Sequence, residues 1–280
     1  DLLVRDVKAV EPTTRDTLLS LERLKVELRF WKLLKKEVEI EEISIRNATF
    51  DTRDFIDGVV VSGHLGELFL ESHGVVFSPE TARINEFSVK NTDVSLTLGS
   101  IESTDTVPSE PLYWKILLDE IDFENVGFAL KMPQDSLFVR TMLPKTTLKN
   151  GVIDLKEASY YVKSFGIDNA ELAYGPKEEL FLQQIGLQLD SIYYCGKDIR
   201  ANIEEFVLKE RSGLELVSTE GRIVSDSVLI QIPKFTMKTT ASSLDLQTKI
   251  GWDVLEMKKT GVLSAKINAE IGKGDVAKIL

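Results

Sequence analysis

The sequence predicts a mainly β protein, built as an elongated, curved and folded-over antiparallel β-sheet with an apolar groove and one or two short helices. Apolar residues recur at every second position over most of the chain, as in "LKVELRF" (24–30) and "LSAKINAEI" (263–271). This alternation is typical of strands that bury one of their two faces. The alternation is interrupted repeatedly in one way, and that interruption predicts that the strands bend.

The interruption is clearest in "ISIRNATF" (43–50). Ile43 and Ile45 lie on one face of the expected strand, but the next large apolar residue, Phe50, is out of phase by one position. Asn47 stands between them. Because Asn tolerates the left-handed backbone region, it can add a bulge that moves every later side chain to the other face. Phe50 then returns to the side of Ile43 and Ile45, so a bent strand keeps one continuous apolar face.

The same arrangement recurs along the chain, either around an Asn or around a substitute for it. The alternative interpretation is a plain turn between two short strands of an ordinary sandwich, and the pattern leaves both open. The recurrences are "FSVKNTDVSL" (87–96) around Asn91, "IDFENVGFAL" (121–130) around Asn125, looser copies around Asn150 and Asn169, a Ser-Gly turn within 206–216 and a Thr/Ser run within 235–246.

Helical periodicity is rare. The stretch 30–37, "FWKLLKKE", favours one or two helical turns, and 14–24, "TRDTLLSLERL", fits a helix or a strand. The stretch 99–111 is rich in Ser, Thr, Glu and Pro, which is typical of a flexible loop. Because the strand pattern resumes beyond this loop, we expect residues 1–280 to form a single elongated β-groove fragment of a larger protein.

Composition excludes some classes of function. The net charge of −11 argues against a nucleic-acid partner, since phosphate neutralisation requires clustered Lys and Arg. The single cysteine, Cys195, excludes an internal disulfide framework and fits a cytosolic or a bacterial periplasmic protein. No stretch approaches the roughly 20 apolar residues of a membrane-spanning helix. The chain opens without Met, so we expect that a signal or anchor precedes it.

Residues for catalysis or metal binding do not converge. The two histidines, His64 and His73, have Glu67 and Glu71 between them. On one continuous strand the two imidazoles would face opposite sides, which argues against a metal site. No nucleophile-elbow serine, phosphate-binding glycine loop or zinc-binding helix motif is present. We therefore expect no enzyme activity, no cofactor and no metal.

Three stretches resemble the AsmA/TamB superfamily, most closely the TamB-like translocation and assembly module proteins of the Bacteroides group. The first, "TRDTLLSLERLKVELRFWKLLKKEVEIEEISIRNATFD", is similar to the N-terminal block of that family. The second is "PLYWKILLDEIDFENVGFAL". The third runs from Ile203 to Ile250 and resembles a recurring family pattern, here Ser212-Gly213-Leu214 followed by 238–244, "KTTASSL".

The resemblance implies a segment of a cell-envelope protein that is anchored in the inner membrane, through a part not present in this chain, and that crosses the periplasm. Family members are similar in architecture to the eukaryotic bridge-like lipid-transfer proteins. Their folded-over sheet forms a trough proposed to conduct phospholipids to the outer membrane. The resemblance also implies a possible role in outer-membrane protein assembly with a barrel partner of the Omp85 type.

The residues with the interrupted alternation are the candidates for an apolar groove that holds a phospholipid or another acyl-chain lipid. The alternatives are that they pack against each other in a closed core, and that the chain is a β-rich surface or adhesive module that binds protein or glycan. Phe outnumbers Tyr by 13 to 6, which favours an apolar floor over a glycan platform. The candidates are Ile43, Ile45, Phe50, Phe87, Val89, Val94, Leu96, Ile121, Phe123, Phe128, Leu130, Phe206, Leu208, Leu214, Leu216, Phe235 and Met237.

Overall fold

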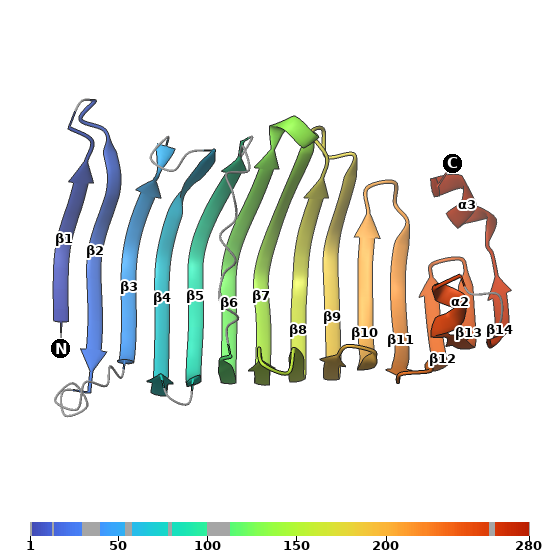
Figure 1. Ribbon diagram of the computed structural model, residues 1–280. Helices are drawn as coiled ribbons and strands as arrows, with labels where there is room; N and C mark the ends of the chain where they lie inside the picture. The colour runs from blue at the N-terminus through green and yellow to red at the C-terminus, as the bar shows by residue number, and fades with distance from the viewer. Residues whose placement is uncertain are drawn as a thin grey trace.

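The computed structural model is one open sheet of 14 strands, and the order of the strands in the sheet is their order in the chain (Figure 1). The structure describes residues 2–12, 14–29, 40–53, 58–77, 80–99, 113–257 and 261–279. The strands are β1 (Leu2–Val10), β2 (Thr17–Leu28), β3 (Ile40–Asp51), β4 (Val59–Phe77), β5 (Glu80–Leu98), β6 (Lys115–Met132), β7 (Leu137–Asp154), β8 (Ser159–Tyr174), β9 (Leu180–Cys195), β10 (Asp198–Glu210), β11 (Glu215–Ser225), β12 (Leu229–Thr239), β13 (Ser243–Gly251) and β14 (Leu263–Glu270). The described residues also form the 3-10 turn η2 (Pro133–Asp135) and the short helices α2 (Trp252–Leu255) and α3 (Lys273–Ile279).

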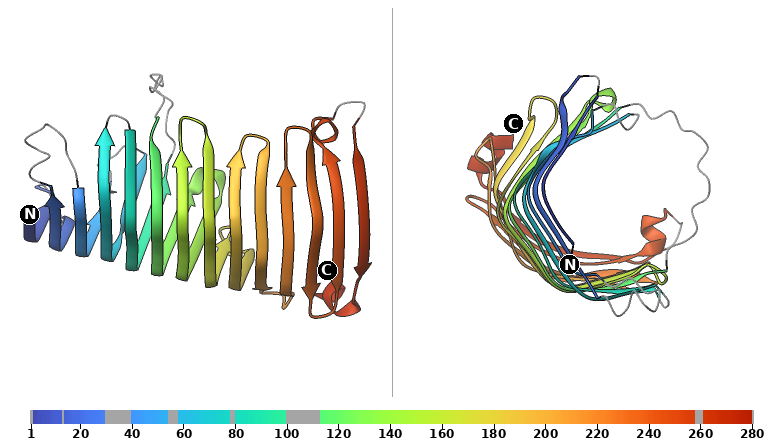
Figure 2. Two further views of the ribbon diagram at one scale, coloured as in Figure 1. Left: turned by 90° about the horizontal axis from the view of Figure 1, so that it is seen from below. Right: turned by 90° about the vertical axis from the view of Figure 1, so that its left-hand side faces the viewer.

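The sheet curls about an axis that runs across the strands, so that its cross-section is an open C (Figure 2). Strands make up 78% of the structure, which confirms the predicted fold class of a long curved sheet with two short helices. One pair departs from the prediction, because β5 and β6 run parallel whereas all other neighbours run antiparallel. The predicted loop at 99–111 lies between these two strands, and all of it except Gly99 falls outside the described residues.

The sheet is a single layer. In the described part of the chain, each strand makes its extensive contacts only with its neighbours in the sheet, while α2 touches β13 and η2 touches β7. No second sheet or helix layer covers the described strands. Few apolar side chains are therefore buried, and these are Leu21, Ala48, Ala82, Val89, Leu118, Ala170 and Ala173.

The five Asn residues singled out in the sequence all lie inside strands and have left-handed backbones. Their φ angles are 47° at Asn47, 50° at Asn91, 52° at Asn125 and Asn150, and 54° at Asn169. The chain runs through each of them within one strand, namely β3, β5, β6, β7 and β8. The bent-strand interpretation is confirmed at these five positions, and the plain-turn interpretation is wrong there.

Neighbouring strands bend at the same level. Asn91 and Asn125 lie opposite each other in the register of β5 and β6, and the Asn125 side-chain amide donates to Asn91 Oδ1 over 3.3 Å. Asn47 lies opposite Gly66 of β4. A Cβ added at Gly66 would meet the backbone carbonyl oxygens of Asn91 at 2.5 Å and Lys90 at 2.8 Å, so only glycine fits beside this corner.

The two recurrences without Asn are hairpins. Gly213, with φ of 88°, lies in the turn between β10 and β11, and residues 240–242 form the turn between β12 and β13. The plain-turn interpretation therefore holds at these places. The stretch 14–24, whose sequence fits a helix or a strand, leads into β2, which begins at Thr17. The helix predicted at 30–37 falls outside the described residues.

Candidate functional site

One face of the curled sheet lies on the inside of the bend, and Gly151 shows which one. Gly151 follows the corner at Asn150. A Cβ added at Gly151 would lie 3.2 Å from the Leu148 side chain and 3.3 Å from the Leu118 side chain. In a straight strand, residues on one face stand well apart. Here the Leu148 side chain and the Cβ direction of Gly151 converge. The face that carries Leu148 and Leu118 is therefore the concave one.

The residues directly after three of the other Asn corners support the same assignment. Ala48, Thr92 and Ala170 follow Asn47, Asn91 and Asn169, and they are only 6%, 5% and 2% exposed. The Asn side chains themselves are exposed. Side chains converge on the inside of a bend, where small residues become buried, and diverge on its outside.

A row of cross-strand neighbours crosses the whole concave face, with one residue from every strand. We call it the floor row. No member is polar, and Gly221 is covered by the ring of Phe235, which a Cβ at Gly221 would meet at 2.7 Å. The floor row is Leu2, Val26, Ile43, Leu70, Phe87, Ile121, Leu148, Phe165, Leu189, Ile203, Gly221, Phe235, Leu246 and Ile267.

Further rows run beside the floor row on the same face. The second row contains one hydroxyl, Thr146, and otherwise only apolar residues: Val4, Leu24, Ile45, Leu68, Val89, Phe123, Thr146, Ile167, Leu187 and Phe206. A third row, near the rim where β6 begins, is Ala82, Ile116, Ile153, Tyr160, Tyr194, Ile199, Ser225, Ile230, Ile250 and Leu263. None of these three rows contains a charged residue.

The groove candidates that belong to strands lie on this concave face, whereas Leu214 lies in the turn between β10 and β11. Some are members of the floor row or the second row, and the others share their face through the register and the alternation of the strands. Val89 is buried, Phe128 is 36% exposed, and the rest are half-buried. The rings of Phe87 and Phe123 meet edge to face, with their centroids 6.1 Å apart. The structure thus brings the candidates together, with no described element above them.

The sequence pattern used to predict the groove did not include the residues of the concave face that lie between the candidates. Leu68 and Leu70 of β4, Leu148 of β7, Phe165 of β8 and Leu187 of β9 belong to the floor row or the second row. In β9 the left-handed corner residues are Gln184 and Ser191, with φ of 53° and 54°. A search for the shift in alternation alone, without the requirement for Asn, would have found these strands.

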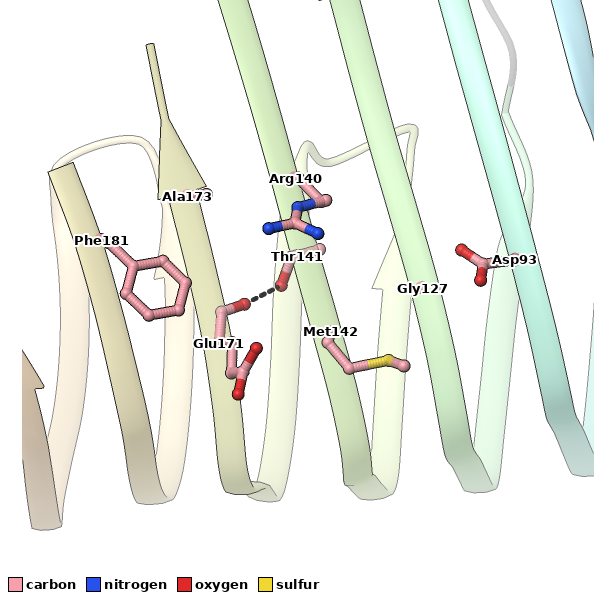
Figure 3. A pocket seen from close by; sticks show the side chains of 8 residues that line it. All are labelled: Asp93, Gly127, Arg140, Thr141, Met142, Glu171, Ala173 and Phe181. Carbon is pink, nitrogen blue, oxygen red and sulfur yellow. Dashed lines mark hydrogen bonds between the residues drawn. The ribbon is translucent and has the colours of Figure 1, made fainter. Parts of the chain in front are cut away.

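The convex face is polar. Asp93, Gly127, Met142 and Glu171 are cross-strand neighbours that lie one position away from concave residues such as Phe128, so they face outward. They line a small pocket with Arg140 and Phe181, and Figure 3 shows these side chains across β5 to β9. Thr141 Oγ1 donates to the Glu171 carbonyl oxygen over 2.9 Å.

Charges alternate along one row of the convex face. The row consists of Arg46, Glu67, Lys90, Glu124, Lys145 and Asp168, in the register of β3 to β8. The ammonium of Lys90 lies 3.3 Å from the Glu124 carboxylate. Opposite charges directly across a strand pair stabilise that pairing modestly. This row of the convex face is charged, whereas the floor row of the concave face is apolar.

In the part of the chain that the structure describes, no group of three or more His, Cys, Asp or Glu side chains could hold a metal ion. The argument that placed the two imidazoles on opposite faces assumed unbroken alternation along the strand, and this assumption was wrong. Leu65 and Leu68 of β4 both face the concave side, opposite Ala48 and Ile45, so the alternation shifts between His64 and His73. His73 Nδ1 lies 2.6 Å from Asn85 Oδ1 and 3.8 Å from the Glu71 carboxylate, and no third His, Cys, Asp or Glu joins them among the described residues.

Two of the carboxyl groups with lowered pKa values, those of Asp154 and Asp226, accept hydrogen bonds within turns. Backbone N–H groups of Leu229 and Val228 donate to Asp226 and lower the pKa of its carboxyl. The backbone N–H of Glu157 likewise lowers the pKa of the Asp154 carboxyl. These bonds fix hairpin ends at the rim of the sheet. They do not mark an acid or base directed at a substrate.

Comparison with known proteins does not assign the chain to a family. No protein-family model matches the chain, and no curated protein matches it either. Among the helices that the structure describes, none has the length and apolar character to cross a bilayer.

Proposed function

We propose that this chain holds or conducts the acyl chains of phospholipids along its concave face, as the periplasmic segment of an inner-membrane-anchored envelope protein. The floor row supports the proposal. It is an apolar row that no charge or hydroxyl interrupts, and it takes one residue from each of the 14 strands. Apart from Gly221, which the Phe235 ring covers, its members stay half-exposed or exposed, because no described layer covers them.

The energetics of burial favour a lipid as the occupant. A soluble protein rarely leaves a contiguous apolar surface open unless that surface binds something. Each CH₂ group of an acyl chain gains about 0.8 kcal/mol when it leaves water for an apolar surface. A chain of such groups can therefore lie along the floor row without any directed polar contact.

The absence of charge in the three rows also bears on selectivity. A headgroup phosphate finds no cationic side chain in these rows, so the headgroup stays at the open side of the trough in water. Selection by headgroup is then weak, and we expect lipids of several headgroup classes with similar acyl chains. The membrane anchor, the periplasmic location, transport towards the outer membrane and an Omp85-type barrel partner are parts of the proposal that rest on the sequence resemblance alone.

Mass spectrometry of the gently purified protein tests the proposal. We expect bound phospholipid in the unmodified protein and its loss in Phe123→Asp and Phe235→Asp. A carboxylate in the trough makes binding of acyl chains unfavourable, and because it remains solvated there, the sheet itself persists. Phe69 lies on the convex face between Leu68 and Leu70, so Phe69→Asp is the matched control and should retain lipid.

Circular dichroism of each variant checks that the sheet persists. Absence of lipid from the folded unmodified protein would refute the proposal, and so would equal lipid retention by the concave and convex variants.

A further inference from the structure

Tyrosine and phenylalanine occupy different levels of the concave face. The floor row and the second row contain phenylalanines but no tyrosine, whereas the third row, at the rim, contains Tyr160 of β8 and Tyr194 of β9. These two residues are 41% and 43% exposed. A tyrosine ring with its hydroxyl suits a level at which an apolar surface meets water. The rim at β8 and β9 is therefore amphipathic, whereas the floor row is apolar.

The two rim tyrosines form a pair. Tyr160 and Tyr194 lie directly opposite each other in the register of β8 and β9, and their ring centroids are 5.9 Å apart with 40° between the ring planes. Among the described residues, neither hydroxyl has a hydrogen-bond partner. A phenol hydroxyl can donate to a carbonyl oxygen. Two such donors on neighbouring strands therefore stand together at the rim, and both remain available to a ligand.

The distance from this pair to the floor row matches the length of an acyl chain. Phe165 of the floor row follows Tyr160 by five positions in β8, a path of roughly 16 Å at about 3.3 Å per residue. Half of the hydrocarbon core of a bilayer, the depth that one acyl chain fills, is roughly 15 Å. A lipid whose tails reach the floor row along β8 therefore has its ester groups at the level of the tyrosine pair.

We propose that Tyr160 and Tyr194 form the subsite for the ester-linked glycerol of a diacyl lipid, and that their hydroxyls donate to its two ester carbonyl oxygens. The inference rests on the proposed function and deepens it, because the apolar rows recognise only the acyl chains. A diacyl lipid carries its esters on neighbouring glycerol carbons, just as the two donors lie on neighbouring strands. The residues 156–157 and 197–198, which flank the pair in the chain, carry mixed charges, so the rim selects the ester level and not an anionic headgroup.

The two rims of the trough differ at these strands. Tyr174, the last residue of β8, lies at the opposite rim between Val139 and Leu180 in the register. This rim offers one phenol there, where the rim at Tyr160 offers two. The glycerol of the lipid is therefore assigned to the rim where β8 begins, and its tails are directed towards the floor row.

A comparison of ester and ether lipids tests the hydrogen bonds. Soluble dioctanoyl phosphatidylcholine and its dioctyl ether analogue are used to displace a fluorescent fatty acid from the purified chain. The ether lipid lacks the carbonyl acceptors, so the ester lipid should bind about tenfold more tightly, or roughly threefold for each of two hydrogen bonds. The double variant Y160F/Y194F should lose this preference.

Tyr161→Phe is the matched control, because Tyr161 is the next residue of β8 and faces the convex side opposite Val152. It should keep the preference of the unmodified protein for the ester lipid. Equal affinity of the unmodified protein for the two lipids would overturn the inference, and so would a preference that persists unchanged in the double variant.

A photocrosslink locates the lipid along β8. Benzoylphenylalanine replaces Tyr160, Phe165 or the convex Tyr161, and each protein is irradiated after incubation with vesicles of dipalmitoyl phosphatidylcholine. Fragment mass spectra should place the attachment at the glycerol or the first methylenes from position 160, and at distal methylenes from position 165, with little product from position 161. Distal attachment from position 160 would overturn the inference alone, whereas no lipid at either concave position would overturn the proposed function as well.

Discussion

The central strands and the C-terminal strands keep one apolar face in different ways. β4 to β9 contain 16 to 19 residues each, and β5 to β8 each turn a corner at a left-handed Asn. β10 to β14 shorten from 13 to 8 residues, and no non-glycine residue within these described strands has a positive φ. In β12 the shift in alternation falls at Pro233, between Ile232 and Phe235.

This difference shows where the curl of the sheet is encoded. A long strand cannot remain straight and still enclose a trough, so β5 to β8 each place an Asn at a sharp corner, and β9 places Gln184 and Ser191 at two corners. A short strand spans less of the arc, and ordinary bulges suffice. Because each strand packs mainly on its neighbours, we expect substitutions to act on the region where they lie.

The largest expected effect is at the corner of β4. Gly66→Ala places a methyl group against the carbonyl oxygens of Asn91 and Lys90, which are backbone atoms and cannot move aside. We expect a loss of about 3 kcal/mol of unfolding free energy. In the C-terminal region, Gly221→Ala meets mainly the Phe235 ring, which can rotate, and should cost about 1 kcal/mol or less. Urea denaturation of both variants measures the difference, and equal losses would contradict the regional contrast.

An intermediate effect is expected from the corner Asn itself. Asn91→Val places a β-branched side chain in the left-handed region and removes the bond from Asn125, so it should cost about 1–2 kcal/mol. Asn91→Gly should cost less, since glycine adopts this conformation freely. Thr236→Val in β12, a strand without a left-handed corner, should be nearly neutral. The idea fails if Asn91→Gly destabilises the sheet as much as Asn91→Val does.

The smallest effect is expected at the end of the C-terminal region, where Asp275 of α3 is buried, with 3% of its surface exposed. The hydroxyls of Ser242 and Thr239 donate to its carboxylate and lower the pKa of Asp275. The stabilisation is therefore present above the unfolded pKa of about 4 and disappears as pH falls through the lower folded value. Protection factors of residues 273–279, which correct for the pH dependence of intrinsic amide exchange, should fall on acidification while those of the central strands stay constant. Asp275→Asn should remove this pH dependence, and protection factors that do not change with pH would argue against a role for the Asp275 carboxylate.

The sequence carries much of the fold and part of the site. The Asn corners were readable because an amide side chain and an out-of-phase apolar residue are both visible in one stretch. The corners at Gln184 and Ser191 were not predicted, because those residue types favour the left-handed region less than Asn does, and only the shift in alternation marks them. Hairpins at 213 and 240–242 carry the same pattern as a corner, and only the pairing of strands separates the two.

The parallel pairing of β5 and β6 could not be predicted from the sequence either. Strand direction across a long polar connection depends on which rim the chain returns to, and 99–111 contains no residue that specifies it. The glycines at 63 and 66 acquire their role only from the approach of the β5 backbone, since a Cβ at Gly63 would lie 2.2 Å from the Asp93 carbonyl oxygen.

A sheet one layer thick has no interior that must be resized when a strand is gained or lost. Its 14 strands, about 4.8 Å apart, span roughly 60 Å. Each added hairpin would extend that distance by roughly 10 Å without disturbing distant packing. Length is thus an adjustable dimension in this architecture, and a reach suited to a given gap between two surfaces can arise by duplication of a single hairpin unit.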